Sequence, residues 1–355
     1  MKVLSKTQII LALCAASTFS HARTSTFVID KEANDVELGI ALKDYTSNPT
    51  ELDTMATDWT NQLAVKSIYN GTVNLVLTGN YSDLYPAPET QTAIGMNFVL
   101  ENGNAMTFTV KSGGTLGLRI KTAAADFSTS TACGELKLTG ENANLVVEGT
   151  GKVYASSLQM FERDVNRMVT LKDQAYFFTG GTAQIGGSTK SNTLTKTSTL
   201  RLEGSQIEMV RVRNLQFVGT EGTTKDNAMG GKFEFIADAN GISTIQNESA
   251  IVAFSGVIEI DFSGLKWDTT WGEDHKFTLV TATSGNTLLQ DWVDTNSASN
   301  GNLANIIGAE GEFSADNYNL FVTISRDSLV IPEPSAYAAI FGAIAIAFAA
   351  YRRRK

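Results

Sequence analysis

A short sequence pattern returns at intervals of 31 to 38 residues between about residues 72 and 262. Each copy has an alternating apolar pair, a few turn-forming residues and a second alternating pair. "ELKLTGENANLVVEG", which begins at Glu135, and "TLRLEGSQIEMVRV", which begins at Thr199, are two of the copies. A recurring interval of this size predicts a protein built of stacked repeats. The leading apolar residues of the copies are Phe98, Leu136, Val169, Leu200 and Phe233.

Within each copy the apolar residues occupy every second position, as Leu136 and Leu138 do. This period of two is typical of β-strands with one buried face. Strands this short cannot bury that face alone, so successive copies have to stack. We therefore predict an all-β fold, a parallel β-helix (β-solenoid) with about three strands per coil over residues 72–262. Regular short strands are also typical of a pair of β-sandwiches, which stays open as the alternative.

The open ends of such a stack expose strand edges, so segments 23–71 and 263–330 are predicted to be capping regions. In the N-terminal one, apolar residues at helical spacing after Thr50 predict a short amphipathic helix. These residues are Leu52, Met55, Trp59 and Leu63. In the C-terminal one, "KFTLVTA" and "GEFSADNYNLFVTI" predict strands, the second a hairpin that turns at Asp316 and Asn317. Its tryptophans are predicted to pack in the core, not to stack on sugars: Trp267, Trp271 and Trp292.

Residues 1–22 have the pattern of a secretory signal peptide: two lysines, an apolar stretch and small residues before a cleavage site after Ala22. A lipoprotein signal ending at Cys14 is the alternative, but bulky Leu13 stands where such signals carry a small residue. Cleavage leaves Cys133 as the single cysteine, which excludes an intrachain disulfide. We interpret Cys133 as a small half-buried residue, not a nucleophile.

The exported body would be strongly acidic. All 37 Asp and Glu lie between residues 23 and 334, whereas six of the 28 Lys and Arg lie outside this range. The body therefore carries 22 positive against 37 negative charges, a net charge of −15. Such a surface repels nucleic acid and anionic lipid headgroups, so neither is expected as a partner.

The chain closes on an apolar run from Ala336 to Tyr351, followed by four basic residues. As a helix this run is about 24 Å long, which is marginal for a hydrocarbon core of about 30 Å. The basic residues are expected to stop it at the cytoplasmic side, with the body outside. A buried core helix is the alternative, but it would place four cations at the end of a helix that is apolar all round. The basic cluster is Arg352, Arg353, Arg354 and Lys355.

The closing segment, residues 331–355, resembles the PEP-CTERM sorting signal of Gram-negative bacteria. Pro332, Glu333 and Pro334, the apolar span and the basic cluster occur in the same order. The resemblance implies recognition by an exosortase, a membrane sorting enzyme, and cutting near the Pro-Glu-Pro stretch. The protein would pass through the inner membrane to the outer cell surface or the extracellular matrix. The stretch around residues 230–282 also looks similar to the last coils of autotransporter-type β-helical passengers.

No catalytic constellation, metal site or cofactor site stands out in the sequence. Arg119 and Lys121 resemble the Arg-x-Lys element of polygalacturonases, but the chain has no Asp-Asp pair, and we interpret both as solvated strand residues. His275, the one histidine of the body, is expected in a surface loop, and Asp238 to Gly241 is expected to form a turn. The leading hypothesis is a structural or adhesive protein associated with exopolysaccharide. The alternative is a divergent polysaccharide lyase or glycoside hydrolase on the same scaffold.

Overall fold

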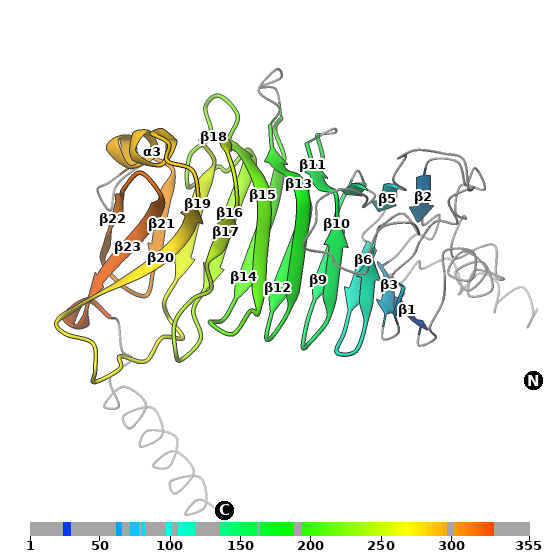
Figure 1. Cartoon of the computed structure of the whole chain (residues 1–355), viewed down its shortest axis with the longest axis horizontal. Helices are drawn as coiled ribbons and strands as arrows, with labels where there is room; N and C mark the ends of the chain where they lie inside the picture. Colours follow the sequence, from blue (N-terminus) through cyan, green and yellow to red (C-terminus); the bar gives the residue numbers. More distant parts are fainter. Residues whose placement is uncertain are drawn as a thin grey trace, which may run out of the picture.

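A computed structural model describes residues 24–29, 62–65, 72–77, 80–81, 97–100, 106–117, 135–138, 140–161, 164–187, 194–296 and 302–329. These residues are mostly β-strands, which confirms the all-β class. The strands form two sheets, called sheet A and sheet B, between which the chain passes back and forth (Figure 1). A strand of sheet A is followed along the chain by one or two strands of sheet B, and strands pair with their counterparts in the neighbouring repeats.

Within the described residues, sheet A has nine strands, and every neighbouring pair in it is parallel. Its order follows the chain order of its strands, so each new repeat adds one strand at the same edge (Figure 1). The strands are β1 (Thr24–Ile29), β3 (Thr72–Leu77), β6 (Met106–Val110), β9 (Ala143–Val147), β12 (Arg167–Lys172), β14 (Thr197–Glu203), β16 (Gly230–Ile236), β19 (Val257–Asp261) and β21 (Ala304–Ile307).

Sheet B is also parallel until its last two strands, which pair antiparallel. Four short described strands lie beside its main path: β10 pairs with β13 and continues through β7 to β4, and β18 pairs with β15. The main path is β2 (Gln62–Val65), β5 (Asn97–Leu100), β8 (Glu135–Leu138), β11 (Ser157–Met160), β13 (Tyr176–Gly186), β15 (Met209–Val218), β17 (Ile245–Asn247), β20 (Asp274–Ala282), β23 (Asn319–Ser325) and β22 (Gly311–Ala315). The side strands are β4 (Asn80–Tyr81), β7 (Thr115–Gly117), β10 (Lys152–Ala155) and β18 (Ile251–Phe254).

The core lies between the sheets and consists of columns of apolar residues from successive strands. Leu145, Val169, Leu200 and Phe233 stand in register on adjacent strands of sheet A, and each is at most 1% exposed. Three leading residues of the sequence repeats, Val169, Leu200 and Phe233, therefore occupy equivalent places in sheet A, whereas the other two, Phe98 and Leu136, pair with each other in sheet B. Burying such a side chain contributes about 1.5–3 kcal/mol, so the stack is stabilised chiefly by these columns.

The C-terminal end of the stack is formed by an antiparallel hairpin and one helix. β22 and β23 pair across a turn at residues 316–318, as the sequence predicted. Helix α3 (Leu288–Asn296) contacts this hairpin, and its Trp292 is 3% exposed beside Phe254 and Phe313. Trp267 and Trp271 pack against the same core, which confirms the predicted packing role of the three tryptophans.

The structure differs from the sequence interpretation near the N-terminus. Leu63 was assigned to an amphipathic helix, but it lies in β2 and pairs with Phe98, because the local alternation of Leu63 and Val65 continues the ladder. The other residues of that expected helix lie outside the described residues. The ladders also extend on both sides of residues 72–262, through β1 and β2 before them and β20 and β21 after them.

Candidate functional site

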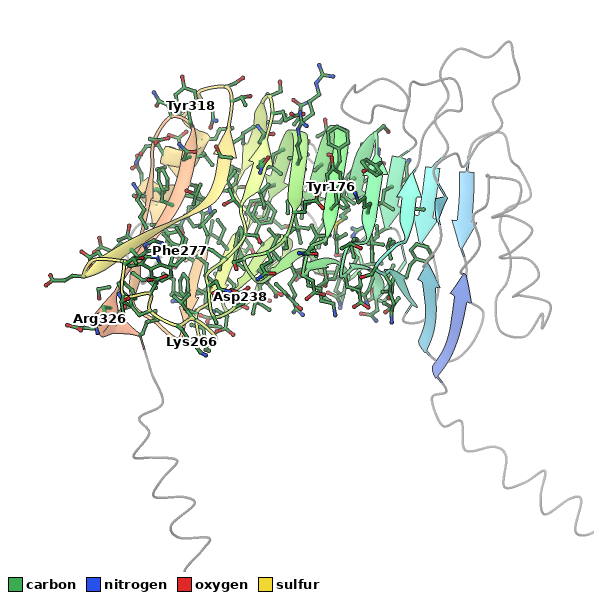
Figure 2. All side chains as sticks on the ribbon, turned by 60° about the horizontal axis from the view of Figure 1, so that its bottom comes forward. Tyr176, Asp238, Lys266, Phe277, Tyr318 and Arg326 are labelled. Carbon is green, nitrogen blue, oxygen red and sulfur yellow. The ribbon has the colours of Figure 1, made fainter. Side chains whose placement is uncertain are left out.

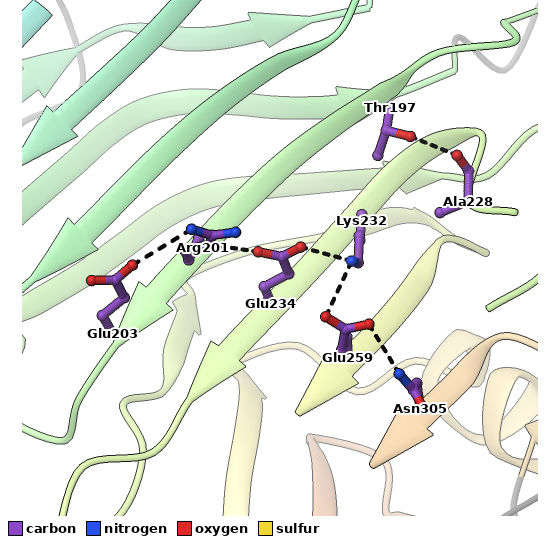
Figure 3. A network of polar contacts seen from close by, with 8 residues as sticks. All are labelled: Thr197, Arg201, Glu203, Ala228, Lys232, Glu234, Glu259 and Asn305. Carbon is purple, nitrogen blue, oxygen red and sulfur yellow. Dashed lines mark hydrogen bonds and ion pairs between the residues drawn. The ribbon is translucent and has the colours of Figure 1, made fainter. Parts of the chain in front are cut away.

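A ladder of charged side chains crosses the outward face of sheet A over β14, β16 and β19 (Figure 3). The Arg201 Nε atom donates to Glu234 Oε2 at 2.5 Å, and Arg201 Nη1 lies 3.7 Å from Glu203 Oε1. Lys232 Nζ lies 2.7 Å from Glu234 Oε1 and 3.2 Å from Glu259 Oε1. Positive and negative groups thus alternate along this chain of contacts, and Lys232 bridges Glu234 and Glu259, which are opposite each other on neighbouring strands.

The period-two pattern of the sequence explains why these side chains meet. Leu200 and Leu202 face the core, so Arg201 between them faces outward. Arg201, Glu234 and Glu259 occupy the same register position on three consecutive strands. A shift of one residue in any strand would turn its charges into the core, so the ladder helps to fix the register.

Glu234 is the most deeply buried acid of this ladder and is 8% exposed. Burial disfavours its charged form, but hydrogen bonds and charge from Lys232 and Arg201 outweigh this effect. The pKa of Glu234 therefore lies below its ordinary value of 4.5. The carboxylate is held charged by its neighbours, which ties the stability of the ladder to pH.

We expect the free energy of unfolding to fall as the pH drops below about 4.5, and Glu234 to account for part of this loss. The sign follows because the unfolded carboxyl takes up a proton at a higher pH than the folded one. Urea unfolding of the wild type and Glu234→Gln at pH 7, 4 and 3 measures the effect. The variant should lose less stability between pH 7 and 3. Equal losses in both proteins would show that Glu234 carries no linked proton.

A second ion-pair group joins the ends of three neighbouring strands of sheet A. Glu148, which follows β9, contacts Lys172 Nζ at 2.8 Å and Lys111 Nζ at 3.5 Å. The hydrogen bond from Lys172 lowers the pKa of Glu148 despite partial burial, and the same bond raises the pKa of Lys172. These charges hold strand ends together and are not free for chemistry.

A hollow of about 450 Å³ lies at the ends of β12, β14 and β16, where these strands of sheet A turn toward sheet B. Its charged lining is of mixed sign and includes Lys172, Asp173, Glu203 and Asp238. The alternative of a glycan-cleaving enzyme requires several carboxylates and a basic group in one groove, and this hollow is lined by three carboxylates and one lysine. Asp173, however, accepts a hydrogen bond from the Gly149 backbone N–H at 3.1 Å.

Asp238, labelled in Figure 2, organises the turn at this hollow. Its carboxylate accepts hydrogen bonds from the backbone N–H groups of Ser205 at 2.9 Å, Asn240 at 2.7 Å and Gly241 at 3.0 Å. Burial favours the neutral acid, but these bonds outweigh it and hold the pKa of Asp238 below its ordinary value. The turn expected at Asp238 to Gly241 is confirmed, and the carboxylate serves to stabilise it.

A second hollow, of about 390 Å³, lies at the C-terminal hairpin and is acidic. Asp274, Glu310 and Glu312 line it together with the hydroxyl-bearing residues Thr323 and Ser325. Across the described part of the chain, no group of three or more His, Cys, Asp and Glu is placed to hold a metal ion. This hollow therefore offers negative charge without the geometry of a metal centre.

The position of His275 corrects the sequence interpretation of a surface loop. His275 lies in β20, is half-buried, and its ring stacks on Trp271 with centroids 3.8 Å apart. Its strand position places it in line with Phe277, which faces the core and is also labelled in Figure 2. Burial lowers the pKa of His275, although Asp268 opposes this effect. The His275 ring therefore packs at the edge of the core, beside Trp271.

The sorting and cleavage residues predicted from the sequence lie outside the described residues, as do Cys133, Arg119 and Lys121. Within the residues that the structure covers, no helix has the length and apolar character to cross a membrane. The predicted span at 336–351 falls beyond them. The sorting and cleavage residues are Ala22, Pro332, Glu333, Pro334, Arg352, Arg353, Arg354 and Lys355.

Comparison of the chain with family models, curated proteins and solved structures gives no match. The resemblance of the C-terminal segment to a sorting signal therefore rests on its own residues.

The charged ladder was not predicted from the sequence, although the sequence contains a signal for it. When the repeats are aligned on their apolar pairs, Arg201, Glu234 and Glu259 fall at the same outward position. Lys232 falls two residues before Glu234, on the same face. Alignment of the repeats by strand phase would therefore have placed Arg201 beside Glu234, and Lys232 on the same face as the two glutamates.

Proposed function

We propose that this protein is an exported, rod-like structural or adhesive protein of the outer cell surface or extracellular matrix, associated with exopolysaccharide. Its body would be a β-solenoid that carries no active site. The observation that supports this proposal best is the unbroken parallel order of sheet A, in which each repeat adds one strand to the last. A stack of this kind makes a long, regular surface suited to repeated weak contacts with a polymer.

The order in which the chain connects the strands supports a β-solenoid, beyond the general all-β class. Between β9 and β12 the chain passes through β10 and β11, which pair with the first and second parts of β13. One circuit thus has a strand in sheet A and two strand segments in sheet B, as the three-stranded coil of a β-helix requires. Two sheets of a sandwich would carry their strands in mainly antiparallel pairs.

The distribution of charge favours the structural role over the glycan-cleaving alternative. Carboxylates that line the mixed-sign hollow are engaged in turns and ion pairs, as Asp238 and Glu203 are. A general acid or base needs a carboxyl that can exchange its proton with a substrate, and inverting or retaining hydrolysis needs two such groups across one bond. The lowered pKa of Asp238 suits a fixed anion, not a proton donor.

The proposal also includes export of the chain from the cytoplasm and its sorting at the inner membrane. Residues 1–22 would direct the chain out of the cytoplasm, and residues 331–355 would hold it briefly in the inner membrane for an exosortase. Release would follow cutting near Pro332, Glu333 and Pro334. The two prolines would favour an extended segment around Glu333, which a protease-like site could bind.

The intact mass of the protein recovered from its native cells tests the sorting step. We expect the surface or matrix fraction to lack residues 1–22 and the residues beyond the Pro-Glu-Pro stretch. A variant with Pro332, Glu333 and Pro334 changed to alanine is the control, and it should keep its tail and remain in the membrane fraction. Recovery of the wild type at full C-terminal length from the inner membrane would refute the proposal.

A further inference from the structure

The turn between β16 and β17 contains an asparagine followed by a glycine, Asn240 and Gly241. The sequence has four such pairs, and this one lies within the described residues. Asn240 is exposed to water, whereas Gly241 is buried. An asparagine before a glycine is prone to spontaneous deamidation, because glycine has no Cβ atom to shield its nitrogen. The turn therefore carries a reactive pair at the surface.

Deamidation of this pair is a reaction of the chain with water. The Gly241 nitrogen forms a bond to Asn240 Cγ, the bond from Cγ to Nδ2 breaks, and the Gly241 proton leaves with Nδ2 as ammonia. Water then opens the five-membered imide (succinimide) at either carbonyl group, which gives aspartate or isoaspartate. No oxidant, reductant or enzyme takes part. The first step needs a Gly241 nitrogen that can give up its proton.

We propose that Asn240 is a latent deamidation site, which the Asp238 carboxylate keeps from reacting in the folded protein. Asp238 Oδ1 accepts hydrogen bonds from the backbone N–H groups of Gly241 at 3.0 Å and of Asn240 at 2.7 Å. The imide has no N–H group at Gly241, so the first of these bonds is lost on the way to it. A hydrogen bond to a charged group is costly to give up, which slows the reaction. This protection is independent of where the protein acts.

The charge of Asp238 opposes the reaction as well. Loss of the Gly241 proton develops negative charge on the nitrogen, beside a carboxylate that is already negative. Burial favours the neutral acid, but hydrogen bonds from Ser205 and from the two turn residues outweigh it, so the pKa of Asp238 lies below its ordinary value. A carboxylate with a low pKa is a weak base. Asp238 therefore holds the Gly241 proton and does not remove it.

The backbone of the turn is fixed on its other side too. The Asp238 N–H group donates to the Gly241 carbonyl oxygen at 3.0 Å, so the two residues close the turn in both directions. Gly241 has φ of +137° and lies against Phe277, whose Cε1 atom would be 3.0 Å from an added Cβ. Asp238 and Phe277 are both labelled in Figure 2. The turn therefore has to open locally before the ring can form, and isoaspartate would then lengthen its main chain by one carbon.

Peptide mapping of the full chain by mass spectrometry tests the proposal. Tryptic cleavage after Lys232 and Lys266 places Asn240 in one peptide, whose fragments locate aspartate or isoaspartate at this position. The rate is measured at neutral pH for the folded protein and for the protein in guanidinium chloride. Asn240 should react at least about tenfold more slowly in the folded protein, because the hydrogen bond to Asp238 is given up first. Equal rates in the two states would overturn the proposal.

Two variants separate the carboxylate from the rest of the turn. Asp238→Ala removes the acceptor, so Asn240 of the folded variant should deamidate at a rate close to that of the unfolded wild type. Ser205→Ala also removes a partner of Asp238 but keeps its bonds to Asn240 and Gly241, so it should react as slowly as the folded wild type.

Circular dichroism shows whether each variant keeps its strand content. If Asp238→Ala does not fold, Asp238→Asn replaces it, and its neutral and weaker acceptor should still give a faster reaction than the folded wild type. A folded variant without the carboxylate that reacts as slowly as the wild type would overturn the role of Asp238.

Discussion

Replacing Gly186 by alanine is expected to lower the free energy of unfolding by more than about 3 kcal/mol. Gly186 ends β13 with φ of +90°, in the region that favours glycine, and it is buried. A Cβ atom there would overlap the backbone of Gly231 in β16 and the carbonyl oxygen of Val218 in β15. Because these neighbours are backbone atoms, sheets A and B would have to move apart locally.

Gly222→Ala separates the two causes of this loss. Gly222 also has a positive φ, +80°, but it lies in an exposed turn, and the nearest atom to an added Cβ is Met229 Cε at 3.9 Å. This variant should lose only about 1 kcal/mol, the usual cost of a left-handed backbone for alanine. Urea unfolding of the three proteins gives both values. Similar losses in the two variants would mean that the close approach at Gly186 costs nothing.

The need for glycine at position 186 could not be predicted from the sequence, whereas the direction in which the strand residues face could. Alternation fixed which residues face inward, and the all-β class and the C-terminal hairpin followed from it correctly. The close approach of Gly186 to Gly231 depends on how far one sheet lies from the other at a corner. That distance is a result of packing across 45 residues of chain, which no local pattern encodes.

The error at Leu63 has a related cause. Apolar residues spaced for a helix over 52–63 overlap with the alternating Leu63 and Val65, and short segments fit both periods. Pairing with β5 favours the strand conformation at Leu63 over the helix, because an existing strand edge supplies hydrogen bonds and packing that stabilise a short segment better than an isolated helix. His275 was missed for a similar reason, since its neighbour Trp271 comes from a loop whose path the sequence does not specify.

Arg167→Met is expected to destabilise the protein by about 3 kcal/mol. Arg167 begins β12 and is only 2% exposed, although it carries a charge. Its Nη1 atom donates to the carbonyl oxygen of Leu138 at 2.6 Å, and its Nε atom donates to Ser198 Oγ at 2.9 Å. The side chain thus joins β8 of sheet B to β14 of sheet A.

Methionine fills much of the same space but donates no hydrogen bond, so the Leu138 carbonyl would lose a charged donor in a site closed to water. Arg201→Met is the control, because Arg201 lies one strand away in the same sheet with 32% of its side chain exposed. It should cost about 1 kcal/mol, as partly exposed ion pairs do. Arg167→Lys should recover only part of the loss, because an ammonium lacks the fork that contacts both partners. If Arg167→Met and Arg201→Met cost the same, the buried arginine is not what holds the two sheets together at this corner.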